Sequence, residues 1–162
     1  MTYFQSILGK LLVTTGYYWH NGVHSEVIDL QNPNVTCNDF PDFPIEMDDA
    51  FGGLFETKFQ VQGNMFAAIC GGQSSDIDNQ SKCYIYYPSR QEWTEAEEKL
   101  LQPRSTFGSI LINDRKVMWI TGGFGESNLA DTKTTTEFVS LDQPNVQGVI
   151  KVFFTEQLSR QE

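Results

Sequence analysis

Short apolar runs that end at a glycine recur along the chain. The first covers 11–16 and ends at Gly16, the second covers 66–72 and ends at Gly72, and the third covers 117–123 and ends at Gly123. The intervals from Gly16 to Gly72 and from Gly72 to Gly123 are 56 and 51 residues. Short apolar runs bounded by turn residues are typical of buried β-strands, so the pattern predicts a repeated β-structure.

The sequence predicts four strands around the second of these runs. Aromatic, β-branched and small apolar residues at 49–55, 66–70 and 83–87 are separated by polar loops, and a short edge segment carries Trp93. The third unit repeats this order at 105–112, 117–121 and 136–141 with an apolar tail at 149–154, and the first unit has candidate strands at 3–8, 11–15 and 26–30. We therefore divide the chain into units at 1–48, 49–103 and 104–162.

A ten-residue block supports true internal repetition. Residues 26–35 and 137–146 share Glu, Leu, Pro, Asn and Val in register, which is five of the ten positions. One segment departs from the β pattern, because 94–101 begins like a helix capping box and continues with good helix formers. We expect at most two helical turns there, before Pro103.

The order of these residues resembles the kelch repeat. That family has an arginine-led first strand, a second strand ending in a glycine pair, then a tyrosine and a tryptophan. The resemblance implies an all-β fold, a partial kelch-type β-propeller of about three four-stranded antiparallel blades, at the repeat period of about 50 residues. The structural markers are Gly16, Gly71, Gly72, Tyr86, Trp93, Arg104, Gly122 and Gly123.

The markers have physical roles in such a fold. Paired glycines adopt backbone angles that are closed to other residues and allow close approach to the propeller axis, while Tyr86 and Trp93 are expected to pack between neighbouring blades. The outer repeats are degenerate: Tyr17 stands where the first unit should have its second glycine, and no tryptophan follows Leu141.

Three blades are too few to close a ring, since propellers have about 4–8 blades. The chain is then part of a longer protein, one of two chains that assemble, or an open arc. The sequence favours missing blades, with self-association as an alternative.

Charge narrows the choice of partner. The chain carries 21 acidic and 11 basic residues and a net charge of −10, which disfavours nucleic acid and anionic membrane surfaces. No apolar run approaches the about 20 residues of a membrane-spanning helix, so we expect no membrane insertion. We expect instead a protein partner of unknown identity.

Cysteines and glycosylation sequons bear on the compartment. Cys70 ends one predicted strand and Cys83 begins the neighbouring one, so the two can form a cross-strand disulfide or remain two buried thiols. Asn34 and Asn79 head N-x-Ser/Thr sequons. These features favour an extracellular or secreted protein, with a cytoplasmic one as the alternative.

The candidate catalytic and metal sites are weak. His20 and His24 lie in a glycine- and asparagine-containing loop where helical ligand spacing has no meaning, and 76–87 lacks the glycine and glutamate of a calcium loop. We therefore expect no metal, no cofactor and no enzymatic activity. The alternative is a fragment of a secreted, galactose-oxidase-like enzyme or carbohydrate-binding protein.

The loops that follow the glycine-ended strands remain as candidate binding surfaces. Aromatic residues in a loop offer a large contact area with a polar tip. We predict a protein-interaction module whose contact residues include Tyr17, Tyr18, Trp19, His20, Asp76, Asp78 and Phe124.

Overall fold

The structure is a computed structural model that describes residues 2–3, 10–15, 24–32, 38–56, 65–74, 79–97, 99–112, 117–125, 132–140 and 151–155. These residues form antiparallel sheets, and none of them lies in a helix, so the expected all-β class is confirmed. Within the same residues, no helix is present that could cross a membrane.

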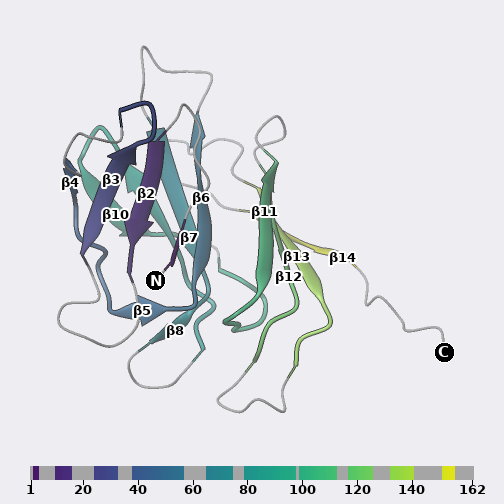
Figure 1. The fold of residues 1–162 in the computed structure, drawn as a ribbon. Helices are drawn as coiled ribbons and strands as arrows, with labels where there is room; N and C mark the ends of the chain where they lie inside the picture. Colours follow the sequence, from purple (N-terminus) through teal and green to yellow (C-terminus); the bar gives the residue numbers. More distant parts are fainter. Residues whose placement is uncertain are drawn as a thin grey trace.

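Three four-stranded sheets follow one another along the chain, each built from one sequence unit (Figure 1). The first sheet has the order β1-β2-β3-β4, the middle sheet β10-β9-β7-β6 and the third β11-β12-β13-β14, with a small β5-β8 ladder beside them. The strands of the first sheet are β1 (Thr2–Tyr3), β2 (Lys10–Thr14), β3 (Ser25–Asp29) and β4 (Asn38–Phe40). Those of the ladder and the middle sheet are β5 (Met47–Asp48), β8 (Gln73–Ser74), β6 (Phe51–Glu56), β7 (Met65–Cys70), β9 (Cys83–Tyr87) and β10 (Glu92–Glu95). Those of the third are β11 (Gly108–Ile112), β12 (Val117–Thr121), β13 (Thr136–Ser140) and β14 (Lys151–Thr155).

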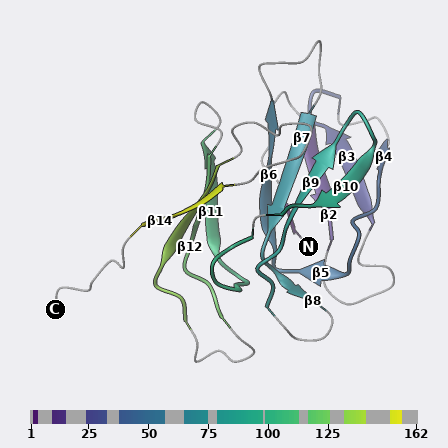
Figure 2. The same cartoon turned by 180° about the vertical axis from the view of Figure 1, so that it is seen from behind.

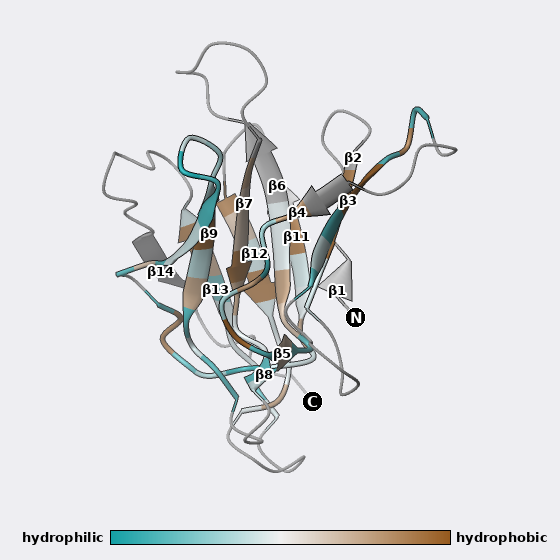
Figure 3. Cartoon of the chain, turned by 90° about the vertical axis from the view of Figure 1, so that its left-hand side faces the viewer, coloured by the Kyte–Doolittle hydropathy of each residue, from teal (hydrophilic) through white to brown (hydrophobic). Residues whose placement is uncertain are grey.

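The middle sheet lies between the other two and is buried on both faces (Figures 1 and 2). Because successive side chains of a strand point to opposite faces, β7 and β9 divide their residues between two cores. One core joins Ala67, Ile69, Tyr84 and Tyr86 to Leu12 of the first sheet. The other joins Phe66, Ala68, Cys70, Cys83 and Ile85 to Met118, Ile120 and Val139 of the third. Hydrophobic colouring accordingly runs along β7 at the centre of the chain, whereas β3 of the first sheet also carries hydrophilic colouring (Figure 3).

Two predicted strands begin later than the sequence pattern suggested. The strand expected from 49 begins at Phe51, and the one expected from 105 begins at Gly108. Asp49 and Thr106 have φ angles of 48° and 49°, which turn the chain before each strand starts. The remainder of the strand expected at 3–8 lies outside the described residues.

The short helix expected at 94–101 is wrong. Residues 92–95 form β10, and the described residues that follow are irregular. Their N–H groups are taken by carbonyl groups of other segments, which removes the i to i−4 bonds that a helix needs. The bonds are Ala96 N to Cys83 O at 2.8 Å, Leu100 N to Ser81 O at 2.8 Å and Arg104 N to Gln80 O at 3.1 Å.

Tyr86 and Trp93 pack between the first and middle sheets. The ring of Phe40 at the end of β4 lies 4.2 Å from that of Tyr86, and the ring of Phe43 lies 5.0 Å from that of Trp93. Trp93 also donates its indole N–H to the carbonyl oxygen of Pro41 at 3.0 Å. These aromatic contacts fix the two sheets against each other.

The glycine pairs have the predicted backbone. Gly71, Gly72, Gly122 and Gly123 have φ angles of 66°, 99°, 70° and 89°. A Cβ on Gly72 would lie 2.7 Å from that of Ala50, and a Cβ on Gly123 would lie 2.5 Å from the carbonyl oxygen of Ser105. Both positions therefore require glycine for conformation and for space.

In the first unit, the glycine pair is interrupted at Thr15 and not, as the sequence had suggested, at Tyr17. β2 ends at Thr14, and the next residue, Thr15, has a φ angle of 55°. Gly71 and Gly122 hold the same place directly after β7 and β12. The replaced glycine is thus the first of the pair, at Thr15, and not the second, at Tyr17; Gly16 lies outside the described residues.

The last cross-strand pair between the second and third strands of each sheet is made by different residue types in the three sheets. Thr14 pairs with Ser25, Cys70 with Cys83 and Thr121 with Thr136, at the same register of their sheets. The hydroxyl groups of Thr14 and Ser25 are hydrogen-bonded, and those of Thr121 and Thr136 are 2.9 Å apart. Cys70 and Cys83 form the predicted disulfide. Cys37 lies outside the described residues.

Arg104 is the largest fully buried side chain of the described residues. Its guanidinium donates to Gly122 O at 2.9 Å, to Thr135 O at 3.1 Å and to a carboxylate oxygen of Glu137. The other carboxylate oxygen of Glu137 accepts the N–H of Leu101 at 2.7 Å. The charges of this buried pair are therefore matched and hydrogen-bonded, as burial requires.

The glycine geometry leads to a graded prediction. Gly71→Ala places a methyl group 2.7 Å from the carbonyl oxygen of Arg104 in a left-handed backbone, and we expect it to lower the unfolding free energy by about 2–5 kcal/mol. Gly122→Ala meets nothing nearer than 3.7 Å, so only its backbone strain of about 1–2 kcal/mol remains. Gly108→Ala is the control, with an expected change within about 0.5 kcal/mol. Urea unfolding measures all three, and equal losses at Gly71 and Gly122 would contradict the close contact.

A second prediction concerns the buried ion pair. One repeat earlier in the chain, Met47 and Tyr84 hold the places of Arg104 and Glu137. Met47 comes directly before the bridged residue Asp48, as Arg104 comes directly before Ser105, and Tyr84 occupies the strand position equivalent to Glu137. Arg104→Met leaves the Glu137 carboxylate buried and unpaired, so we expect a loss of about 3–5 kcal/mol in urea unfolding. Adding Glu137→Tyr, which copies the Met47 and Tyr84 arrangement, should recover part of that loss.

The control for this pair is exposed. Lys82 and Glu95 are 3.0 Å apart with about half of each side chain exposed, and Lys82→Met should leave the unfolding free energy nearly unchanged because solvent screens this pair. An Arg104→Met variant as stable as Lys82→Met would refute the role of the buried pair.

Candidate functional site

Most of the predicted contact loops cannot be placed. Tyr17, Tyr18, Trp19, His20, Asp76 and Asp78 lie outside the described residues, as does the sequon at Asn34. Phe124 and Asn79 are described, and they follow Gly123 and Gly72 along the chain.

Asn79 and Phe124 connect two of these loops. The side-chain amide of Asn79 donates to the carbonyl oxygen of Phe124 at 3.0 Å, across 45 positions of sequence. Phe124 is also bridged to Ser105 and Thr132. The segments after the middle and third glycine pairs therefore meet at one end of the sheets. Glycosylation of Asn79 stays a prediction, and the amide nitrogen that would carry the glycan is the atom that makes this bond.

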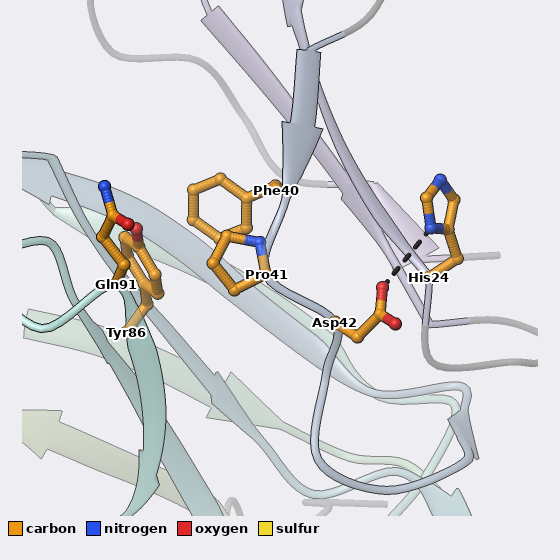
Figure 4. A pocket seen from close by; sticks show the side chains of 6 residues that line it. All are labelled: His24, Phe40, Pro41, Asp42, Tyr86 and Gln91. Atoms are coloured by element: carbon orange, nitrogen blue, oxygen red, sulfur yellow. Dashed lines mark ion pairs between the residues drawn. The ribbon is translucent and has the colours of Figure 1, made fainter.

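A cleft of about 630 Å³ lies where the first and middle sheets meet. Phe40 ends β4, Tyr86 belongs to β9, and Gln91 lies in the turn before β10. In Figure 4, His24 and Asp42 face each other on one side of Phe40 and Pro41, while Tyr86 and Gln91 lie together on the other. The lining residues are His24, Phe40, Pro41, Asp42, Tyr86 and Gln91.

His24 sits between two carboxylates. Its Nε2 is 3.1 Å from an oxygen of Glu26 and its Nδ1 is 3.4 Å from an oxygen of Asp42. The hydrogen bond to Glu26 raises the pKa of His24, the small loss of hydration opposes it, and Asp42 adds to the rise. Burial raises the pKa of Tyr86 above its ordinary value.

The lining of this cleft is suited to binding a ligand that has both apolar and polar surface. Two aromatic rings and a proline give an apolar surface, and carboxylate, amide and imidazole groups supply hydrogen bonds at its edges. Among the residues that the structure describes, no group of three His, Cys, Asp or Glu side chains could hold a metal ion.

Only one local sequence signal points to this cleft. The spacing of His20 and His24 is only a weak metal pattern, and the kelch resemblance makes Tyr86 a packing residue. Asp42 and Gln91 belong to connections between strands, and their meeting depends on how two sheets pack. The one local signal is the spacing of His24 and Glu26, which places both on one face at the start of a strand.

A second surface lies on the outer face of the third sheet. Ile110, Trp119 and Phe138 are cross-strand partners on β11, β12 and β13. The rings of Trp119 and Phe138 are 4.9 Å apart, edge to face. Trp119 is 40% exposed and Ile110 55%, whereas Met118 and Ile120 on the opposite face are fully buried. The sheet therefore presents an open apolar row away from the core.

We predict that the pKa of His24 is above the ordinary histidine value of about 6.5. Its protonated form is favoured in the folded chain, so the stabilising contribution is complete below about pH 6.5 and is lost as the pH rises through the raised pKa. Glu26→Gln should lower the pKa of His24 more than Asp42→Asn, because the bond to Glu26 is the shorter. NMR titration measures both shifts, with His20→Gln to assign the signals, and a larger effect of Asp42→Asn would contradict this geometry.

Comparison with known proteins places the fold. No family model matches the chain, and no curated protein matches it. Among solved structures, that of YjhT is similar with a TM-score of 0.70 at 11% sequence identity, over 98% of this chain and 51% of that one. The chain thus spans about half the length of YjhT, and at this identity the similarity concerns the fold alone.

Proposed function

We propose that the chain forms three blades of a kelch-type β-propeller and acts as a non-enzymatic protein-interaction module. Three four-stranded antiparallel sheets follow one another in chain order, each with a residue of positive φ directly after its second strand, namely Thr15, Gly71 and Gly122. The similarity in fold to YjhT over 98% of the chain agrees with this proposal. The chain matches 51% of YjhT, which leaves room there for about as many sheets again.

The observation that carries the proposal is a contact between equivalent residues of successive units. The bridge between Asp48 and Gln73 recurs between Ser105 and Phe124. Asp49 and Thr106 therefore hold equivalent places. Thr106 donates from its hydroxyl group to the carboxylate of Asp49 at 2.8 Å, and from its N–H to the carbonyl oxygen of Asp49 at 3.2 Å. Equivalent positions meet in this way when repeated blades surround a common axis.

The contact face of the module is the set of loops after the glycine pairs. The bond between Asn79 and Phe124 joins two of them into one surface. The net charge of −10 favours a partner with a basic surface, because opposite potentials speed encounter and set orientation.

The test removes acidic side chains from this face. Asp76→Ser with Asp78→Ser changes the loop after the middle glycine pair, while Asp29→Ser with Glu92→Ser removes the same charge at the opposite end of the sheets. We expect affinity capture with quantitative mass spectrometry to yield a partner that is depleted with the loop variant and retained with the control. Equal recovery with both variants would contradict the proposed face.

The cleft favours a second candidate, a carbohydrate-binding protein. Phe40 and Tyr86 provide aromatic surface, and Asp42 and Gln91 provide hydrogen-bonding groups at its edges, which is the combination that a sugar ring requires. Glycan-array binding that is lost in Asp42→Asn and Gln91→Ala, and kept in the loop variant, would favour this candidate over the interaction module.

A further inference from the structure

We propose that the outer face of the third sheet is a docking surface for the first sheet of a second copy of this chain. The inference rests on the proposed blade repeat and names a partner for it. Two chains of three sheets each would then close a ring of six, within the range of about 4–8 blades that propellers have.

The register of the three sheets shows that the equivalent faces of the first and middle sheets are buried. The cross-strand pair Thr121–Thr136 matches Cys70–Cys83 and Thr14–Ser25. Trp119, Ala68 and Leu12 each lie two residues before the first member of these pairs, so they occupy equivalent positions. Leu12 and Ala68 are fully buried against the next sheet in chain order, whereas Trp119 is 40% exposed. The third sheet therefore presents the face with which the first and middle sheets pack on their successors.

The complementary face lies on the first sheet. Leu11, Val13 and Ile28 point away from the middle sheet and are all partly exposed. By the same register they match Met118, Ile120 and Val139, which the third sheet buries against the middle one. The chain thus carries, at its two ends, the two halves of an interface that it forms twice internally.

The chemistry of the two faces is compatible with such packing. On β11, β12 and β13 the outer face of the third sheet is neutral, with threonines and a serine beside the apolar row: Ile110 and Ile112, then Val117, Trp119 and Thr121, then Thr136, Phe138 and Ser140. By register the charged position of this face is Lys151 on β14, the partner of Ser140. The face of the first sheet also carries two acidic positions: Glu26, the cross-strand partner of Val13, which pairs with His24, and Asp39, the partner of Glu26. Burial of Trp119 and Phe138 would give the association an apolar driving force.

A second copy satisfies both faces at once. In a two-fold arrangement, the third sheet of each chain meets the first sheet of the other, so the two interfaces are identical and no apolar face is left for further growth. Each chain carries a net charge of −10, which opposes association at long range. Added salt should therefore favour the dimer, because it screens this repulsion.

Sedimentation velocity tests the proposal with the chain of 162 residues. We expect a dimer of twice the 18.4 kDa chain mass that becomes tighter with salt. Trp119→Lys should shift the protein to a monomer with an unchanged circular dichroism spectrum, and Ile28→Glu should do the same from the other face. The matched control is Leu101→Lys, since Leu101 is 52% exposed and lies outside both faces.

The double variant decides whether the two faces meet. Trp119→Lys combined with Ile28→Glu places opposite charges across the proposed interface, and we expect it to restore the dimer. A double variant that stays monomeric, a wild type that is monomeric at all concentrations, or a series of larger species would each overturn the proposal. A monomer that still captures a partner through its loops would overturn the ring of two chains while leaving the proposed interaction module intact.

Discussion

The structure depends on how Arg104 joins two sheets. Its carbonyl oxygen accepts the N–H of Gly72 at 2.8 Å, so its backbone belongs to the turn that ends β7. Its side chain runs into the third sheet and bonds to the residues that follow β12 and begin β13. One residue therefore links the middle and third sheets through both its backbone and its side chain, and glycine at 71 is needed because that carbonyl lies so close. The aromatic packing of Trp93 on Phe43 has the same effect between the first and middle sheets, with apolar contact in place of charge.

The local pattern of apolar residues predicted four of the strands closely. Apolar runs with β-branched and aromatic residues located β7, β9, β12 and β13 to within one residue, because such runs have few alternatives once glycine ends them. The helix expected at 94–101 failed because its amide groups found partners on β9 and before it, and tertiary bonds outweigh a weak propensity. The glycine replaced in the first unit was misplaced by two residues, since the sequence alone does not show where a strand ends.

The candidate sites were harder to foresee. The run 117–120 is apolar throughout, and its pattern predicts burial on both faces although Trp119 is 40% exposed. Whether a sheet face is covered depends on the next sheet, and periodicity within a strand carries no information about that. The cleft has the same origin, because His24, Asp42 and Tyr86 come from three separate segments that meet only when two sheets pack. Charge, in contrast, could be read directly, and it limited the class of partner from the start.

The buried position of the Cys70–Cys83 disulfide controls when it can form or be reduced. Two hydroxyl pairs, Thr14–Ser25 and Thr121–Thr136, join the same strand positions without sulfur, so oxidation adds a covalent bond to a contact that the repeat makes in any case. Cys70 and Cys83 are fully buried in the core between the middle and third sheets. Thiol–disulfide exchange requires a thiolate to reach one of the sulfurs, and that path opens only when the two sheets separate. The redox state of the pair is therefore set by the surroundings in which the chain folds, and it persists unchanged wherever the folded protein is carried afterwards.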